Sequence, residues 1–167
     1  MVSWWTFDET LEDFLGNNNL VSIDWSFIGG KVGQAFVFDG NDAPVYALDS
    51  DSLDVSSVTI DAWIKPVAFS PDSLAQTIIW KGDSFGLILV ADGHVGFGIS
   101  KENGDTGVDS SEIVNLNKWA HIVATFDELS GISKIYVNGV LETNDQTPFP
   151  GPIQKSSSNL YIGSEDE

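Results

Sequence analysis

The stretch from residue 119 to residue 141 reads WAHIVATFDELSGISKIYVNGVL, and its pattern decides the fold class. Its first part, Trp119–Phe126, alternates in character and predicts a strand with one aliphatic face, made of Ala120, Ile122, Ala124 and Phe126. A second run, Ser133–Asn138, leads into Asn138-Gly139, a dipeptide that tolerates the positive φ angles of a two-residue type I′ hairpin turn. The stretch therefore predicts antiparallel strands joined by tight turns, and not βαβ units.

The rest of the chain has the same character, with short runs rich in Val, Ile, Phe, Tyr and Trp between Gly, Asp, Asn and Pro. Asp92-Gly93 predicts a second two-residue hairpin turn. The other segments that we expect to form strands are Trp4–Phe7, Ala35–Asp39, Val45–Leu48, Val58–Pro66, Thr77–Lys81, Phe85–Ala91, Val95–Ser100, Glu112–Val114, Val140–Glu142 and Leu160–Gly163. So many short strands in 167 residues indicate one domain, residues 1–167, folded as an all-β, antiparallel two-sheet β-sandwich.

Several strands combine an aliphatic face with a mixed polar and aromatic face. In Val58–Lys65 the aliphatic face holds Val58, Ile60, Ala62 and Ile64. The mixed face holds Thr59, Asp61, Trp63 and Lys65. We expect the aliphatic faces to form the core between the sheets and the mixed faces to form outer or concave surfaces.

The chain is strongly acidic: 25 Asp and Glu stand against seven Lys, with no Arg and no Cys, for a formal net charge of −18. Without Arg or a basic stripe, nucleic-acid binding and attachment to an anionic membrane surface are excluded as functions. The acidity favours cationic partners such as Ca²⁺, and adaptation to a salty medium explains it as well. No apolar run is long enough to span a membrane. Met1–Trp5 lacks the features of a signal peptide, and a chain whose signal peptide had been removed would lack them too.

Eight segments follow one another in a characteristic order: Trp5–Glu9, Leu15–Asn19, Gly30–Gly40, Val58–Pro66, Ile79–Gly82, Lys118–Asp127, Ile135–Val140 and Leu160–Gly163. In this order they resemble the laminin G-like jelly-roll domain of the concanavalin A-like lectin/glucanase superfamily. The resemblance implies a jelly-roll sandwich and an extracellular or surface-exposed location. It leaves the function open, because this fold hosts adhesion, lectin and enzyme activities.

The end of the chain departs from the family pattern. Relatives usually continue into one more strand, which returns beside the N-terminal strand, whereas this sequence stops at Ser164–Glu167. We therefore expect a C-terminally truncated domain or a differently closed edge. An open edge near Trp4–Phe7 predicts a weak homodimer.

The sequence predicts no catalytic residues and no enzyme. The Glu-x-Asp-x-(x)-Glu strand motif of the family's glucanase branch is absent, and a retaining glycosidase needs two carboxyls about 5–5.5 Å apart. The pairs Glu12-Asp13 and Asp127-Glu128 would diverge on a strand, and Asp49-Ser50-Asp51 lies in a loop. A degenerate glycoside hydrolase is kept as the second alternative function.

Acidic loops are the candidate metal site, because Ca²⁺ binds carboxylate, amide and backbone oxygens. The resemblance favours the loop around Asp13, since relatives often place an acidic residue just before the Gly-Asn loop. The candidate Ca²⁺ ligands are Asp8, Asp13, Asn17 and Asp42. The alternative interpretation is that these residues form turns by bonding to their own backbone.

Sugar binding needs a flat aromatic ring beside hydrogen-bonding side chains. The candidate ligand-binding residues on the mixed faces are Asp61, Trp63, Trp119, His121 and Tyr136. The alternative is that Trp63 and Trp119, which lie inside fold-defining motifs, are covered by packing and that His121 is structural. We also expect Trp80 in the core and His94 in solvent.

These observations favour a non-catalytic carbohydrate- or glycoprotein-recognition module, with Ca²⁺ as the candidate cofactor. The first alternative is a structural or adhesion domain of a larger extracellular or virion surface protein.

Overall fold

The computed structural model describes residues 1–40, 44–70, 75–143 and 147–164. These residues form β-strands and one short 3-10 helix, η1 (Asp51–Leu53), and every strand pairing is antiparallel. The prediction of an all-β, two-sheet sandwich is confirmed. The described part of the chain contains no helix that is long and apolar enough to cross a membrane.

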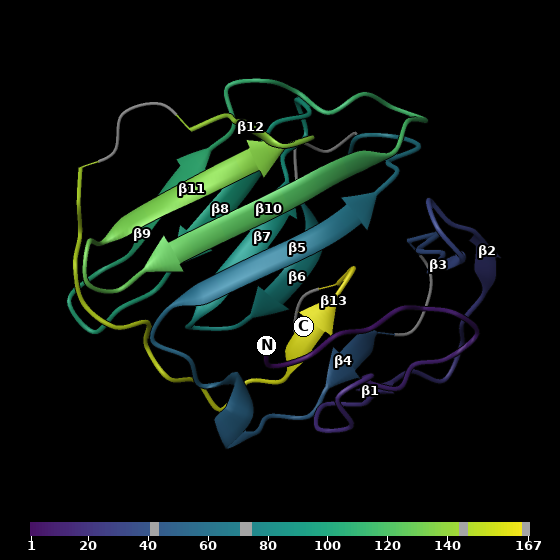
Figure 1. The fold of residues 1–167 in the computed structure, drawn as a ribbon, viewed down its shortest axis with the longest axis horizontal. Coiled ribbons are helices and arrows are strands. Elements are labelled where there is room, and N and C mark those ends of the chain that lie inside the picture. Colours follow the sequence, from purple (N-terminus) through teal and green to yellow (C-terminus); the bar gives the residue numbers. More distant parts are fainter. Residues whose placement is uncertain (41–43, 71–74, 144–146, 165–167) are drawn as a thin grey trace.

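The described residues form two large sheets and one small sheet (Figure 1). The seven-stranded sheet has the order β1-β4-β13-β6-β7-β8-β9, and the four-stranded sheet in front of it has the order β12-β11-β10-β5. The strands of the larger sheet are β1 (Leu20–Val21), β4 (Val45–Ala47), β6 (Gln76–Lys81), β7 (Phe85–Leu89), β8 (Val95–Ile99), β9 (Thr106–Asp109) and β13 (Leu160–Ile162). The others are β5 (Val58–Ile64), β10 (Ala120–Asp127), β11 (Ile132–Val137) and β12 (Val140–Leu141), with β2 (Phe27–Gly29) and β3 (Gln34–Phe36) in the small sheet.

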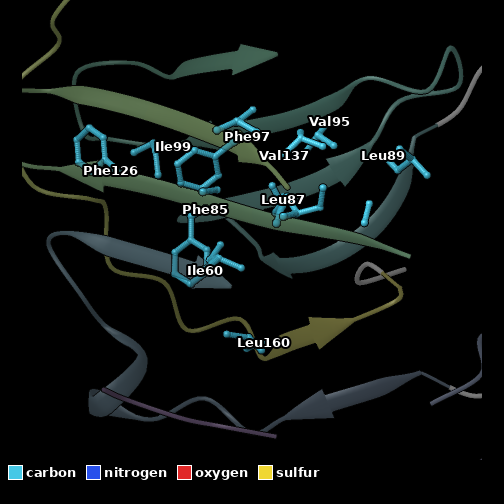
Figure 2. Packing of buried hydrophobic residues seen from close by; sticks show 14 of the residues in the cluster. Ile60, Phe85, Leu87, Leu89, Val95, Phe97, Ile99, Phe126, Val137 and Leu160 are labelled. Atoms are coloured by element: carbon cyan, nitrogen blue, oxygen red, sulfur yellow. The ribbon is translucent and has the colours of Figure 1, made fainter. Parts of the chain in front are cut away.

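The core lies between the two large sheets, on the faces that the sequence predicts to be aliphatic. The four-stranded sheet contributes Ile60, Ala120, Ile122, Ala124, Phe126, Ile135 and Val137. The seven-stranded sheet contributes Val45, Ala47, Phe85, Leu87, Leu89, Val95, Phe97, Ile99 and Leu160. Figure 2 shows side chains of both sheets meeting in this layer. Burial of each large apolar side chain contributes about 1.5–3 kcal/mol to stability, so this layer holds the sandwich together.

One of the two predicted hairpin turns is confirmed and the other is wrong. Asn138 and Gly139 have φ angles of 52° and 81°, as a type I′ turn requires. At the other hairpin, Val90 N donates to His94 O (2.8 Å) and Gly93 N donates to Val90 O (2.9 Å), which gives a three-residue loop. Gly93 has a φ of 95° but Asp92 stays at negative φ, so the turn uses one left-handed residue instead of two.

The expected strands at the margins of the fold need correction. Trp4–Phe7 makes a single bridge, Trp5 to Asp13, and Glu112–Val114 forms no strand. The short strands β1, β2 and β9 were not expected. They contain two to four residues each, which is too few for an alternating pattern to be visible. The other expected strands occur with slightly different ends.

Trp80 was expected in the core, and this prediction is wrong. Its neighbours Ile79 and Lys81 point between the sheets, so alternation along β6 turns Trp80 to the outer face of the seven-stranded sheet.

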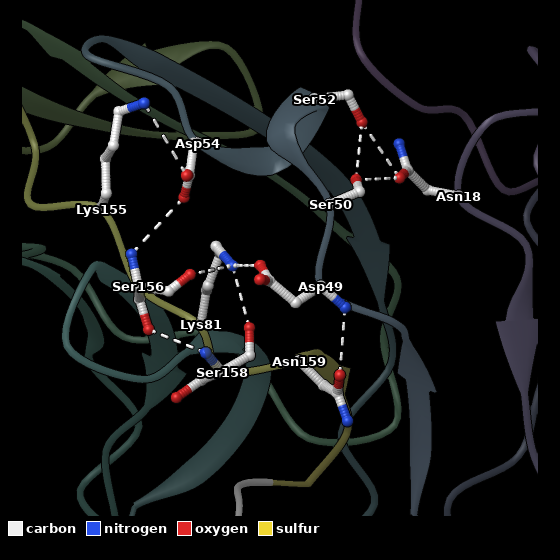
Figure 3. A network of polar contacts seen from close by, with 10 residues as sticks. All are labelled: Asn18, Asp49, Ser50, Ser52, Asp54, Lys81, Lys155, Ser156, Ser158 and Asn159. Atoms are coloured by element: carbon white, nitrogen blue, oxygen red, sulfur yellow. Dashed lines mark hydrogen bonds and ion pairs between the residues drawn. The ribbon is translucent and has the colours of Figure 1, made fainter.

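A completely buried lysine ties loops of the seven-stranded sheet together (Figure 3). The Lys81 ammonium donates to Asp49 Oδ1 (2.6 Å) and to the carbonyl oxygens of Ser156 (3.0 Å) and Ser158 (2.9 Å). An ammonium group has three hydrogens to donate, and all three have an acceptor here. Lys81 therefore joins the segment after β4 to the segment before β13 as a satisfied internal cation.

Candidate functional site

The mixed face predicted for β5, β10 and β11 is the outer face of the four-stranded sheet, which is turned toward the viewer in Figure 1. On this face, Trp63 of β5 lies directly opposite His121 of β10. In the next row, β10 has Asp61 of β5 on one side and Tyr136 of β11 on the other. Asp61, Trp63, His121 and Tyr136 thus lie on one face of one sheet, and Trp119 lies directly before β10.

Three of these side chains contact one another. The rings of Trp63 and His121 stack, with centroids 4.9 Å apart and planes at 27°. His121 Nε2 lies 2.9 Å from Asp61 Oδ1, a hydrogen-bond distance. Lys31 adds a cation, because its Nζ lies 5.0 Å from the centre of the Trp63 ring. We call these four residues, Lys31, Asp61, Trp63 and His121, the Trp63 platform.

The exposure of Trp63 differs from the covered packing that its motif suggests. Trp63 is 45% exposed, whereas Trp119 is half-buried. Within the described residues, β5 is an edge strand of the four-stranded sheet, and Trp63 stands on the side of β5 that faces away from the core. An exposed indole that is fixed by ring stacking offers a rigid, amphipathic contact surface.

Lys31 was missed by the sequence analysis. It lies in the turn between β2 and β3, where Gly33 has a φ of 60° and Gly30 N donates to Gly33 O (2.9 Å). This turn carries Lys31 to the C-terminal end of β5. No local pattern could have revealed the contact, because Lys31 and Trp63 are far apart in the chain and belong to different sheets.

The type I′ turn fixes the end of β10 that carries His121. The backbone N–H of His121 donates to Asn138 Oδ1 (3.0 Å), and the backbone N–H of Asn138 donates to His121 O (2.8 Å). The same turn follows β11, on which Tyr136 is half-buried. The backbone of His121 is therefore held to the turn by two hydrogen bonds.

Asp13, a candidate calcium ligand, is the buried centre of the N-terminal loop. Its Oδ1 accepts hydrogen bonds from the backbone N–H groups of Trp4 (2.8 Å) and Leu15 (3.1 Å), and its Oδ2 accepts from those of Asn17 (3.3 Å) and Asn18 (3.1 Å). Burial opposes ionisation, but the four donors together outweigh it and lower the pKa of Asp13 below its usual value. The carboxylate thus organises the loop as an anion surrounded by N–H groups.

Two of the other candidate calcium ligands, Asp8 and Asn17, have different hydrogen-bond partners. Asp8 accepts from the backbone N–H of Gln34 (2.8 Å), and Asn17 meets Asp13 through its own N–H group. Asp42 lies outside the described residues. In the part of the chain that the structure describes, no three His, Asp or Glu side chains converge as metal ligands would. Calcium binding stays a prediction.

The model of one protein family matches residues 39–167, and its description is the concanavalin A-like lectin/glucanases superfamily. The chain belongs to this superfamily. The resemblance seen in the sequence motifs is confirmed, and the superfamily's β-sandwich is the fold described above. No curated protein matches the chain.

Solved structures with the same fold include domains of very different proteins. Domain 4 of AbnA, a GH43 extracellular arabinanase from Geobacillus stearothermophilus in complex with arabinotriose, is 20% identical, with a TM-score of 0.75 over 97% of this chain and 82% of that one. The botulinum neurotoxin serotype D binding domain is 18% identical, with a TM-score of 0.64 over 93% of this chain and 41% of that one. At these identities the similarity within the superfamily shows the fold alone.

Proposed function

We propose that the chain is a non-catalytic carbohydrate-binding module that recognises sugar through the Trp63 platform. The observation that carries the proposal is the exposed indole of Trp63, which is held by His121 on one strand and approached by Lys31 from another sheet. A sugar ring lays its C–H face on such an indole, while polar groups around the ring bind its hydroxyls.

The polar groups of the platform match that chemistry. Asp61 accepts hydrogen bonds, its carboxylate is well exposed, and one of its oxygens already orients His121. Lys31 donates hydrogen bonds from a position close to the ring. Because ring stacking and hydrogen bonds hold the platform in place before binding, little side-chain freedom is lost when a sugar docks.

A second line of support comes from the structural comparisons. The AbnA domain that shares the fold over nearly the whole of this chain was solved with arabinotriose. A neutral oligosaccharide is therefore the first ligand class to test. Glycans of a glycoprotein present the same chemistry and form a separate arm of the test.

The spacing of carboxylates on this face supports a non-catalytic role. Asp61 pairs with Val123, and the next carboxylate along β10 is Asp127, four residues further. At about 3.4 Å per residue, the two strand positions are about 14 Å apart. Glycosidase pairs lie about 5–9.5 Å apart, so these two acids do not form such a pair.

Affinity electrophoresis of the full chain through gels with arabinan, xylan, β-glucan or a glycosylated mucin tests the proposal. We expect at least one glycan to retard the wild type, and Trp63→Ala to lose most of that retardation. Trp25→Ala is the matched control, because Trp25 is 51% exposed and lies outside the platform. Equal retardation of the two variants would contradict the proposal. Gels run with Ca²⁺ or with a chelator test the calcium prediction separately.

A further inference from the structure

The chain has two places where Asn is followed directly by Gly, Asn103-Gly104 and Asn138-Gly139. In such a pair the backbone nitrogen of Gly can attack the side-chain carbonyl carbon of Asn, because Gly has no side chain to hinder the approach. Both asparagines are exposed, so access to water does not distinguish the two sites. The hydrogen bonds around them do.

At Asn103-Gly104 the attacking nitrogen is engaged in a hydrogen bond. Gly104 N donates to Lys101 O (3.1 Å) within the turn that follows β8. To become a nucleophile, this nitrogen would have to lose its proton and with it the hydrogen bond that the turn depends on. The fold therefore protects Asn103 from the reaction.

The Asp92-Gly93 turn is protected in the same way. Asp before Gly reacts as Asn does, with loss of water in place of ammonia, but Gly93 N donates to Val90 O (2.9 Å). His94, which was expected in solvent, is half-buried directly after this turn, with Nδ1 2.8 Å from Ser110 O. Hydrogen bonds thus hold both this turn and the histidine that follows it.

At Asn138-Gly139 the attacking nitrogen is free. Gly139 is exposed, and in the described part of the chain its N–H has no hydrogen-bond acceptor. The side-chain oxygen of Asn138 accepts a hydrogen bond from the backbone N–H of His121 (3.0 Å). Negative charge develops on this oxygen during the attack, and the N–H group stabilises it as a donor of an oxyanion hole does. This turn therefore combines a free nucleophile with a polarised carbonyl group.

We propose that Asn138 is a site of spontaneous deamidation and that the reaction switches off the Trp63 platform. The nitrogen of Gly139 forms a bond to Asn138 Cγ while the bond from Cγ to Nδ2 breaks. Solvent carries the proton of the Gly139 N–H to Nδ2, which departs as ammonia and leaves a cyclic succinimide. Water then opens the ring at one of its two carbonyl carbons and gives aspartate or isoaspartate.

Isoaspartate disrupts the turn, because the main chain then runs through the former side chain and gains a carbon atom. A hairpin turn of two residues with fixed φ angles has no room for this insertion. Asn138 supplies both hydrogen bonds to His121, through its N–H (2.8 Å) and through Oδ1 (3.0 Å). Their loss releases the end of β10 that carries His121, and Trp63 loses the ring that fixes it. The inference rests on the proposed function and adds a regulation of the same site.

Peptide mapping of the full chain during incubation at neutral pH measures the reaction at both Asn-Gly sites. In the folded chain we expect Asn138 to deamidate several times faster than Asn103. In the chain unfolded in urea the two rates should be similar, because both glycine N–H groups then face water. A ratio of the two rates in the folded chain that does not exceed the ratio in the unfolded chain would overturn the inference.

The effect on the platform is measured on the isoaspartate fraction, which ion exchange separates because deamidation adds a negative charge. NMR of the ¹⁵N-labelled fraction should show a shifted indole N–H signal for Trp63, with unchanged amide signals for Leu87 and Phe97 in the core of the other sheet. The same fraction should lose retardation by the glycan that retards the fresh chain. Asn103→Asp is the matched control, since it adds the same charge in the exposed turn between β8 and β9, and it should keep both properties.

The two proposals fail in different ways. An isoaspartate fraction that keeps the Trp63 signal and the retardation of the fresh chain would overturn the switch and leave the proposed function in place. Loss of the Leu87 and Phe97 signals in that fraction would overturn it too, because the reaction would then unfold the whole domain. A fresh chain that no glycan retards would overturn the proposed function and the regulation, while the two rates would still decide whether Asn138 is the modified residue.

Discussion

Trp63 and His121 sit directly opposite each other on β5 and β10, and their rings stack at 4.9 Å with an interplanar angle of 27°. His121 is in turn hydrogen-bonded to Asp61, two residues before Trp63 on the same strand. An exposed tryptophan would otherwise sample several rotamers. The pair therefore converts a flexible surface side chain into a fixed contact surface.

The Trp63–His121 contact predicts a measurable coupling. Trp63→Ala, His121→Ala and the double variant should give a double-mutant cycle with a coupling free energy of about 0.5–1.5 kcal/mol, as for other ring pairs. Urea unfolding of the three variants measures it. Strictly additive losses would show that the rings do not stabilise each other.

Lys81 is expected to matter greatly for folding. Lys81→Met removes the donor for Asp49 and for two carbonyl groups, so the free energy of unfolding should fall by about 3 kcal/mol. Urea unfolding curves supply the measurement. Lys155→Met is the matched control: its side chain is 78% exposed and 3.9 Å from Asp54, so it should change stability by less than about 0.5 kcal/mol. Similar losses of unfolding free energy in both variants would contradict the stabilising role of the Lys81 hydrogen bonds.

Asp13 predicts a specific dependence of stability on pH. Its pKa is lowered in the folded chain, so the stabilisation is complete above its unfolded pKa of about 3.9 and is lost as pH falls through the lower folded value. Asp13→Asn keeps one acceptor oxygen and should cost about 2 kcal/mol at pH 7.

The difference between wild type and Asp13→Asn should shrink when unfolding is measured at pH 3 in place of pH 7. Asp24→Asn, in the exposed loop before β2, serves as the control and should change little at either pH. A difference in unfolding free energy between wild type and Asp13→Asn that is the same at pH 3 and pH 7 would mean that the charge of Asp13 does not stabilise the loop.

The acidity predicts discrimination between classes of polysaccharide. A polyuronate such as polygalacturonate should fail to retard the wild type at low salt, because the net charge of −18 repels it. Retardation by a neutral glycan should change little with salt. Strong binding to the polyanion at low salt would contradict the ligand class assigned here.

The central part of the fold could be predicted because its pattern is repeated over long strands. On β5 and β10, alternation separates Ile60 and Ile122 from Trp63 and His121, and the structure keeps this division. At the hairpins, Asn138-Gly139 and Asp92-Gly93 look alike in sequence, yet they adopt different turns. Whether the first of two turn residues takes a positive φ depends on the register of the flanking strands.

The candidate site could be predicted in part for the same reason. The residues of one sheet face follow from alternation, but Lys31 reaches Trp63 from another sheet, and this contact depends on tertiary packing. The row of Trp80, Gly86, Gly98 and Gly107 across the seven-stranded sheet could not be predicted either, because its members belong to four strands whose alignment is set by the ladder. Lys81 looked like an ordinary strand lysine, since its partners come from loops that are distant in sequence.

The most direct test of the central claim is calorimetric titration of the full chain with arabinotriose and with oligosaccharides of the glycan that retards it most. The account predicts that Trp63→Ala raises the Kd at least about tenfold, as expected for the loss of one stacked aromatic ring, while the variant stays folded because the lost contact with His121 costs only about 0.5–1.5 kcal/mol. The Kd of Trp63→Phe should lie between those of the wild type and Trp63→Ala, and the Kd of Trp25→Ala should equal that of the wild type. A Kd for Trp63→Ala equal to that of the wild type would contradict the account.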